Sequence, residues 1–247
     1  MVTVDVFQKE EELGMAAAEK IAALLREVIV KEGSANLLLS TGASQFCTLS
    51  ELVKKNVAWD KVTLFHLDEY VGLPESHPAS FRNYLKKRFS ELVPLKQSFF
   101  IAGEGDPEKT ASWFNEIMVQ YPIDVGVIGI GENAHIAFND PPANFDVESA
   151  YHVVTLSDTC KMQQVAEGWF ESMQDVPKQA ISMTSKQIMK CKYIVSPVPG
   201  KRKSAAIRAM LTATKTDPMV PATLLKSHPA FFLYLDQDSA SECAGLF

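Results

Sequence analysis

Cysteine is scarce in this sequence, and the cysteines that occur show no pairing pattern. Cys47, Cys160, Cys191 and Cys243 form neither a Cys-x-x-Cys pair nor another metal-ligand spacing. This distribution argues against a disulfide-stabilised secreted domain and favours reduced thiols in the cytoplasm. We therefore expect no metal centre and a cytoplasmic location.

Long apolar runs and an excess of basic residues are also missing. No apolar run approaches the roughly 20 residues of a membrane-spanning helix. The N-terminal stretch MVTVDVFQKEEELG has neither the basic nor the apolar region of a signal peptide. Lys and Arg number 24 against 30 Asp and Glu, a net charge of −6. These features predict neither nucleic-acid nor membrane binding, whereas a small anion could bind in a local cationic pocket.

Apolar periodicity along the 247 residues alternates between helical and extended segments. This alternation predicts an α/β fold: a doubly wound, mostly parallel, Rossmann-like sheet with helices on both faces. No repeat or low-complexity linker divides the chain, so we expect a single domain over residues 1–247. The expected helices cover residues 10–33, 46–55, 77–92, 107–121 and 200–214. The expected strands cover 35–40, 61–70, 123–131 and 192–199, and residues 230–240 are expected to form a last strand and a loop.

Gly129-x-Gly131-x-x-Ala134 matches the spacing of a dinucleotide-binding loop. Such a loop must open into a helix, but Pro141 and Pro142 follow too soon for a long one. The same loop carries His135 and, five residues later, Asp140. A lone histidine would be interpreted as a core residue, but a carboxylate close enough to orient it favours an acid–base pair.

The segment LDEY places Asp68 and Glu69 at the end of an expected strand. Adjacent acids in such a place are often solvated turn residues or helix caps. Apolar neighbours, among them Leu67 and Leu73, favour a partly desolvated carboxylate whose pKa is raised toward that of a working base.

Two further segments are candidate anion sites. STGAS, residues 40–44, can offer hydroxyl and backbone N–H groups at a strand end, although ordinary strand-to-helix turns look similar. It lacks the Gly-Lys-Ser/Thr ending of a P-loop, so a nucleoside triphosphate is not expected. PGKRK, residues 199–203, puts three cations at a helix start, where a bound anion would offset their repulsion by the helix dipole. A set of exposed lysines and an arginine is the second interpretation of that cluster.

Together and in this order, the four segments resemble the glucosamine-6-phosphate deaminase (isomerase) family, which shares a superfamily with the 6-phosphogluconolactonases. The resemblance spans almost the whole chain and is most specific in LDEYVGLPESHPASF and GIGENAHIAFNDP. It implies isomerisation and deamination of an amino-sugar 6-phosphate, without a metal or organic cofactor. A small anionic sugar phosphate would be the partner, and both a monomer and a homo-oligomer stay open.

The resemblance also implies roles for particular residues. Asp68 would be the base that moves a proton between C2 and C1 of the open-chain sugar. His135 would assist ring opening, oriented by Asp140 and grouped with Asn133. The implied substrate-binding residues are Thr41, Gly42, Ser44, Glu69, Gly129 and Lys203, of which Lys203 would contact the phosphate.

The sequence also departs from the family pattern. The deaminases usually carry an arginine before a Phe-Phe pair over the active site, whereas this chain has Glu167, Gly168 and Trp169 and no arginine there. Losing a bidentate phosphate clamp would weaken binding or signal another substrate, such as galactosamine 6-phosphate. The sequence also leaves open a lactonase-type hydrolase and a non-catalytic sugar-phosphate sensor.

Overall fold

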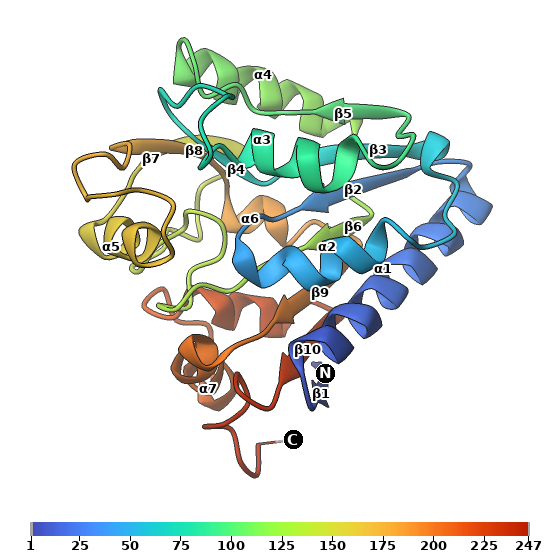
Figure 1. Cartoon of the computed structure of the whole chain (residues 1–247), viewed down its shortest axis with the longest axis vertical. Coiled ribbons are helices and arrows are strands. Elements are labelled where there is room, and N and C mark those ends of the chain that lie inside the picture. The colour runs from blue at the N-terminus through green and yellow to red at the C-terminus, as the bar shows by residue number, and fades with distance from the viewer. Residues whose placement is uncertain (1, 247) are drawn as a thin grey trace.

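The computed structural model describes residues 2–246, so the two ends of the predicted domain, Met1 and Phe247, lie outside the described residues. Strands and helices alternate along most of the chain (Figure 1). The helices are α1 Glu10–Glu32, α2 Phe46–Leu52, α3 Phe81–Leu85, α4 Pro107–Gln120, α5 Asp158–Ala166, α6 Ser185–Ile188 and α7 Ser204–Thr212. The strands are β1 Thr3–Phe7, β2 Ala35–Leu39, β3 Val62–His66, β4 Asp68–Tyr70, β5 Gln97–Phe99, β6 Val125–Val127, β7 Tyr151–Thr155, β8 Gln179–Met183, β9 Tyr193–Val198 and β10 Phe231–Asp236.

The main sheet has seven strands in the order β1-β10-β9-β6-β2-β3-β5, and all of its pairings are parallel. Strand β2 shows why both faces are covered, since its apolar side chains alternate between two cores. Leu37 and Leu39 pack with α1, α2 and α3, whereas Leu38 packs with α4, α6 and α7 on the other face. The predicted doubly wound α/β fold is confirmed.

A second, antiparallel sheet of order β4-β8-β7 lies beside the main one (Figure 1). The single strand expected over residues 61–70 is therefore wrong, because the chain leaves the main sheet after His66 and joins the small sheet at Asp68. The linking residue Leu67 donates its N–H to the carbonyl of Leu39, and its own carbonyl accepts from Met183 in β8. Asp68 thus stands where the two sheets meet.

Several expected boundaries were close and others need correction. Helix α1 ends as predicted, with Gly33 in the left-handed conformation at φ 82° and its N–H bonded to the carbonyl of Ile29. The strand expected over residues 123–131 stops at Val127, so the glycine segment is a loop. The helix expected over 200–214 begins as a 3₁₀ turn, Lys201–Lys203, before α7.

The order of the strands determines where a ligand can bind. From β2 the chain proceeds outward to β3 and β5, and it then returns to β6 and proceeds the other way to β9 and β10. The direction reverses between β2 and β6, and ligands of such sheets bind beyond the carboxyl ends of the strands at this switch point. The loops that follow β2 and β6 are STGAS and the glycine loop.

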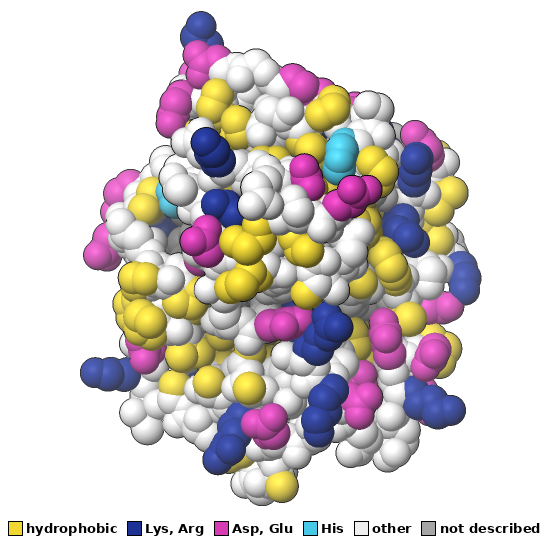
Figure 2. All heavy atoms as spheres, turned by 60° about the vertical axis from the view of Figure 1, so that its left-hand side comes forward, with side chains coloured by type: hydrophobic (Ala, Val, Ile, Leu, Met, Phe, Trp, Pro, Cys, Tyr) yellow, Lys and Arg dark blue, Asp and Glu magenta, His cyan; other side chains and the backbone are white. Residues whose placement is uncertain are grey.

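The surface has mixed charge over the face that Figure 2 displays, where basic and acidic side chains are interspersed with apolar ones. Among residues 2–246, no helix combines the length and the apolar character needed to cross a membrane.

Candidate active site

A cavity of about 410 Å³ opens at the carboxyl ends of β2, β3, β6 and β9. Its volume is typical of small-molecule sites, which span about 300–1,000 Å³. Three of the predicted site residues, Glu69, Asn133 and Asp140, lie outside the lining. The other predicted residues line the cavity, namely Thr41, Gly42, Ser44, Asp68, Gly129, His135 and Lys203.

Asp68 is a buried carboxyl group on the cavity wall, with a relative exposure of 6%. Within residues 2–246, no other group forms a hydrogen bond or ion pair with this carboxyl. Burial, followed by the neighbouring charge of Glu69, raises the pKa of Asp68 well above its ordinary value. The apolar neighbours in the sequence predict this direction, which suits a general base better than an exposed aspartate does.

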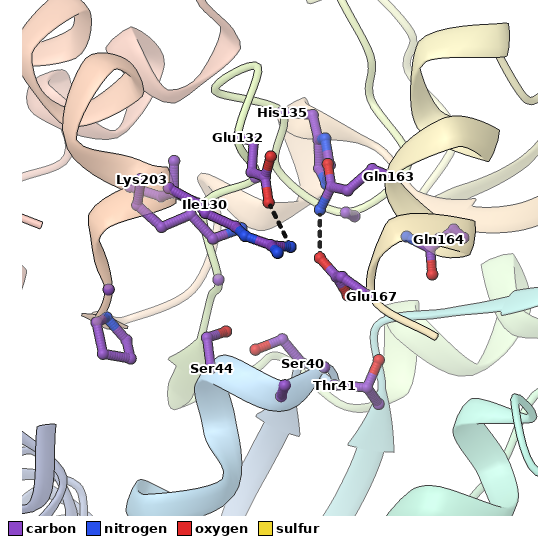
Figure 3. Close-up of a pocket in the computed structure, with 18 of the residues that line it drawn as sticks. Ser40, Thr41, Ser44, Ile130, Glu132, His135, Gln163, Gln164, Glu167 and Lys203 are labelled. Atoms are coloured by element: carbon purple, nitrogen blue, oxygen red, sulfur yellow. Dashed lines mark hydrogen bonds and ion pairs between the residues drawn. The ribbon is translucent and has the colours of Figure 1, made fainter. Parts of the chain in front are cut away.

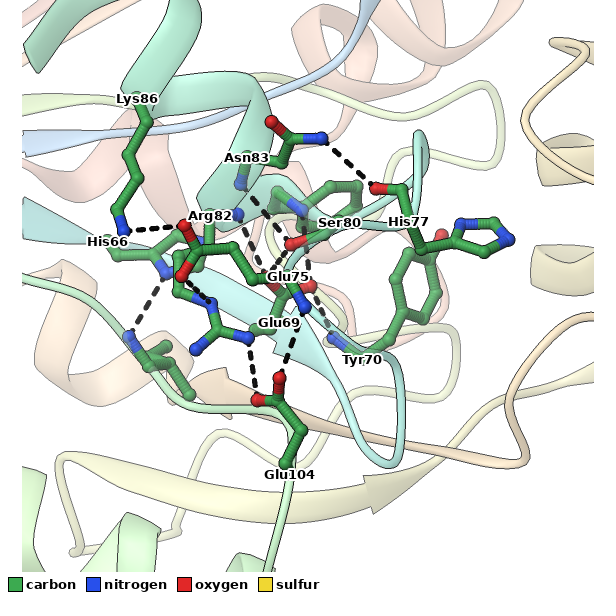
Figure 4. Close-up of polar contacts among 12 residues, drawn as sticks. His66, Glu69, Tyr70, Glu75, His77, Ser80, Arg82, Asn83, Lys86 and Glu104 are labelled. Atoms are coloured by element: carbon green, nitrogen blue, oxygen red, sulfur yellow. Dashed lines mark hydrogen bonds and ion pairs between the residues drawn. The ribbon is translucent and has the colours of Figure 1, made fainter. Parts of the chain in front are cut away.

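Glu69 is not among the residues that line the cavity, and it holds the start of α3 (Figure 4). Its Oε2 accepts from Ser80 Oγ at 2.9 Å and from the N–H of Arg82 at 2.8 Å. Its Oε1 accepts from the N–H groups of Phe81 at 3.2 Å and Tyr70 at 2.9 Å. Burial raises the pKa of Glu69, although these hydrogen bonds act in the opposite direction. The geometry therefore gives Glu69 a supporting position behind Asp68, not one against a ligand.

We expect Glu69→Gln to lower the free energy of unfolding by about 1–3 kcal/mol, because the new amide group would turn two N–H donors toward backbone N–H groups. Urea unfolding measures the change. Glu75→Gln is the matched control, since that side chain is 39% exposed and its ion pairs with Lys86 and Arg82 should contribute less than about 1 kcal/mol. Equal losses in the two variants would contradict a capping role for Glu69.

His135 is held by two residues of its own loop. Its Nδ1 lies 2.6 Å from Asn133 Oδ1 and 3.4 Å from Asp140 Oδ1, and Asn133 Nδ2 donates to the same Asp140 oxygen at 3.3 Å. Both oxygens are acceptors, so in the neutral imidazole the proton belongs on Nδ1 and Nε2 keeps a lone pair. Burial lowers the pKa of His135, and the charge of Asp140 opposes that shift. A neutral histidine with a free Nε2 can take up and return a proton.

The two glycines of the loop differ in how much space a side chain would have. A Cβ atom on Gly131 would lie 2.2 Å from Cε1 of His135, so the imidazole occupies the space that any other side chain needs. A Cβ atom on Gly129 would meet nothing closer than Gln45 Nε2 at 3.5 Å, an ordinary contact. Ala134, beside His135, adopts φ 65°, a conformation that non-glycine residues rarely take and that often accompanies functional sites.

The STGAS loop forms the floor of the cavity. Gly42 has φ 101°, which favours glycine, and its carbonyl accepts from the hydroxyl of Tyr84 at 2.8 Å. Ser44 Oγ accepts from Gln45 Nε2 at 3.1 Å. The hydroxyl-bearing side chains of Ser44 and Thr41 border the open space in Figure 3. The loop is therefore anchored from behind while it presents polar groups to a ligand.

The cationic segment forms the opposite wall from α5 (Figure 3). The N–H of Gly200 donates to both carboxylate oxygens of Asp236, at 3.1 and 3.0 Å, which anchors this segment. Burial lowers the pKa of Lys203, and the charges of Glu167 and Glu132 oppose that shift. Arg202 is 64% exposed and its Nη1 lies 3.8 Å from Glu132 Oε1. Lys203 is the more enclosed of the two cations.

Sequence reasoning missed the contribution of α5, whose residues Gln163 and Gln164 line the cavity beside Glu167, which directly follows the helix. One indication was available, because Ser157 before Asp158 is a typical helix start and its Oγ accepts from the N–H of Cys160 at 3.1 Å. Near the position where the family arginine is missing, the cavity is therefore lined by a carboxylate and two amides.

This arrangement combines a buried carboxyl group, a separate neutral histidine and an enclosed cation around one small-molecule cavity. The carboxyl group and the histidine can both accept protons, and the cation can bind an anion. Together these groups suit proton transfer on a small anionic compound. Among residues 2–246, no three His, Cys, Asp or Glu side chains are grouped as a metal site requires.

Comparison with known sequences gives consistent matches over most of the chain. A family profile described as glucosamine-6-phosphate isomerases/6-phosphogluconolactonase matches residues 8–232. A glucosamine-6-phosphate deaminase of Streptococcus uberis is 34% identical over 236 residues, which are 95% of this chain and 97% of the relative. A protein of the same name from Listeria welshimeri is 37% identical over 227 residues, 91% of this chain and 95% of the relative.

Comparison with solved structures agrees. A monomeric glucosamine-6-phosphate deaminase superposes with a TM-score of 0.87 at 29% identity, covering 97% of this chain and 99% of the other. The 6-phosphogluconolactonase of Trypanosoma brucei has a TM-score of 0.81 at 16% identity, covering 99% of each chain. The second likeness, at so low an identity, concerns the fold alone.

Proposed function

Because the chain belongs to the family of glucosamine-6-phosphate isomerases and 6-phosphogluconolactonases, we propose that it is an enzyme that converts glucosamine 6-phosphate into fructose 6-phosphate and ammonia. The observation that carries this proposal is the buried carboxyl group of Asp68 and the separately held His135 on the wall of one cavity. An aldose-to-ketose shift with prior ring opening needs two such groups at different atoms of the sugar.

The sugar phosphate enters with its phosphate toward Lys203 and the STGAS loop. Lys203 supplies the enclosed positive charge, and Thr41 and Ser44 supply hydroxyl groups. The family arginine has no counterpart in the segment after α5, so the phosphate is held by fewer charge-assisted hydrogen bonds. Arg202, which forms an ion pair with Glu132, lies on the same wall as Lys203 and adds a second, more exposed cation.

Ring opening is the task of His135. Its Nε2 takes the proton of the C1 hydroxyl group and returns a proton to the ring oxygen O5, which gives the open-chain aldehyde. Asn133 and Asp140 keep the other proton on Nδ1, so the imidazole stays in the tautomer that this step needs.

Asp68 then moves the proton that converts the aldose into a ketose derivative. Its carboxylate removes the proton from C2 and the carboxylic acid delivers it to C1, while a proton passes from the amino nitrogen to the carbonyl oxygen on C1, leaving an imine at C2 and a hydroxyl group on C1. Water adds to that imine carbon and ammonia leaves, which yields the C2 ketone of fructose 6-phosphate. The raised pKa of Asp68 favours the first of these transfers, because a more basic carboxylate removes the proton from C2 more readily.

Ammonia release from a panel of 2-amino-2-deoxyhexose 6-phosphates, measured beside lactone hydrolysis, tests this function. We expect release from glucosamine 6-phosphate, with the galactosamine isomer as the comparison for the substrate preference. Tight sugar-phosphate binding without any ammonia release would instead establish a sensor. Hydrolysis of 6-phosphogluconolactone alone would establish a lactonase.

The expectations for domain, cofactor, location and assembly accompany this proposal. We propose that residues 1–247 act as one domain, that the reaction uses no metal or organic cofactor, and that it takes place in the cytoplasm. A homo-oligomer stays a prediction, and one solved structure of similar fold is described as monomeric. Sedimentation velocity of the purified chain distinguishes a monomer from an oligomer.

A further inference from the structure

Gln164 on α5 is a cavity residue that the proposed reaction does not use. It lines the cavity with a relative exposure of only 6%. The hydroxyl group of Tyr70 donates a hydrogen bond of 2.7 Å to its Oε1. In this bond the phenol hydroxyl donates and the amide oxygen accepts, so the oxygen end of the amide group faces Tyr70.

Tyr70 is itself firmly held. Its side chain is fully buried, and its ring centre lies 4.9 Å from that of Phe81, 5.3 Å from that of Phe138 and 5.4 Å from that of Phe170. A ring packed on three sides has little freedom to move its hydroxyl group. The Gln164 amide is consequently fixed with its oxygen toward Tyr70 and its nitrogen toward the cavity (Figure 3).

The polar side chains of Gln163 on α5 and of Glu167, just after the helix, are hydrogen-bonded to each other. Glu167 accepts from Gln163 Nε2 at 2.7 Å and from Trp169 Nε1 at 3.2 Å. By contrast, the Nε2 group of Gln164 has no hydrogen-bond partner among residues 2–246, although the hydrogen bond from Tyr70 to Oε1 holds the amide group in place. Two N–H donors that are oriented but not engaged form a binding group for an acceptor in the cavity.

We propose that Gln164 Nε2 donates a hydrogen bond to a hydroxyl oxygen on C3 or C4 of the sugar, and that Tyr70 is the residue that positions it. Asp68 and Tyr70 are two apart on β4 and share one face of that strand, so the tyrosine that holds Gln164 projects from the same face as the base, and Asp68 and Gln164 both line the cavity. Lys203 lies on the opposite wall (Figure 3). The sugar therefore crosses the cavity from Asp68 to Lys203, and C3 and C4 are the first carbons beyond the reacting C1 and C2. This inference rests on the proposed function.

Gln164→Glu and Gln164→Leu test the hydrogen bond. In Gln164→Glu the ionised carboxylate still accepts from Tyr70 but has no donor, and Gln164→Leu removes both groups. We expect each to raise KM for glucosamine 6-phosphate about tenfold to a hundredfold with a smaller change in kcat. Met162→Leu on the same helix is the matched control, since Met162 is 51% exposed, and should be unchanged.

Substrate analogues give the readout that a structural defect would not affect. The wild-type protein should bind either the 3-deoxy or the 4-deoxy analogue more weakly than it binds glucosamine 6-phosphate. For that analogue, the Gln164 variants should have the same affinity as the wild-type protein. Tyr70→Phe keeps the ring and should raise KM about threefold to tenfold, because the amide is free to rotate. The double variant Tyr70→Phe with Gln164→Leu should be no worse than Gln164→Leu alone.

The outcomes separate this inference from the proposed function. If the Gln164 variants lose equal affinity for glucosamine 6-phosphate and for both deoxy analogues, the inference is overturned. The proposed function still holds in that case, provided that the wild-type protein releases ammonia. If the wild-type protein releases no ammonia, the function is wrong. Calorimetric binding of glucitol 6-phosphate, which has no carbonyl group to react, then still tests Gln164: a weakened variant supports the contact, and unchanged affinity overturns it.

Discussion

Asp68→Asn should abolish turnover while leaving sugar-phosphate binding largely intact. An amide has no basic oxygen that can carry the proton from C2 to C1, so we expect kcat to fall by about 10³-fold or more. Ammonia release measures the loss, and calorimetry with glucitol 6-phosphate measures the binding. A variant with near-normal turnover would show that another group is the base.

The same substitution should stabilise the protein at neutral pH. Burial raises the pKa of Asp68 in the folded state, so the contribution of this carboxyl group to stability is fully present below the unfolded pKa of about 3.9 and is lost as the pH rises through the folded pKa. Asparagine carries no charge to desolvate. Thermal unfolding should therefore show a higher Tm for Asp68→Asn at pH 7 and a difference that shrinks below about pH 4. A lower Tm at pH 7 would contradict the desolvation argument.

His135→Gln should give the second large loss, a fall of about 10²- to 10⁴-fold in kcat/KM, because ring opening would have no general acid–base group. Glucitol 6-phosphate has no ring to open, so its affinity, measured by calorimetry, should stay near that of the wild-type protein. Retention of more than a tenth of the activity would assign ring opening to another residue or to water.

The residues that hold His135 provide a graded control. Asp140→Asn leaves Asn133 Oδ1, the nearer acceptor at 2.6 Å, to keep the proton on Nδ1. The loss of kcat/KM in Asp140→Asn should therefore be smaller than that in His135→Gln. A loss as large as that of His135→Gln would make the charge of Asp140, not the tautomer, the important property.

The sequence predicted the architecture well because the relevant patterns are local. Apolar runs followed by polar residues marked the central strands, and the rule that parallel strands end at one edge brought Asp68 and His135 to the same cavity across 67 positions. The raised pKa of Asp68 also followed from its apolar neighbours. All of these inferences use residues within a few positions of one another, together with one general rule of topology.

What the sequence missed depends on contacts between distant segments. The small sheet pairs β4 with β8, more than a hundred residues later, so LDEY looked like the continuation of one strand. The orientation of Glu69 depends on the N–H groups at the start of α3, and that of Gln164 depends on Tyr70. Periodicity carries no information about which way such a side chain turns.

The packing of His135 against Gly131 has a consequence for how this family's sequences are compared. In a saturation library scored by activity, Gly131 should tolerate almost no replacement, because a Cβ atom there would lie 2.2 Å from Cε1 of His135. Gly131 would then rank with the catalytic residues in any map of mutational tolerance. Its intolerance would record the shape of a neighbouring imidazole and not a contact with the sugar.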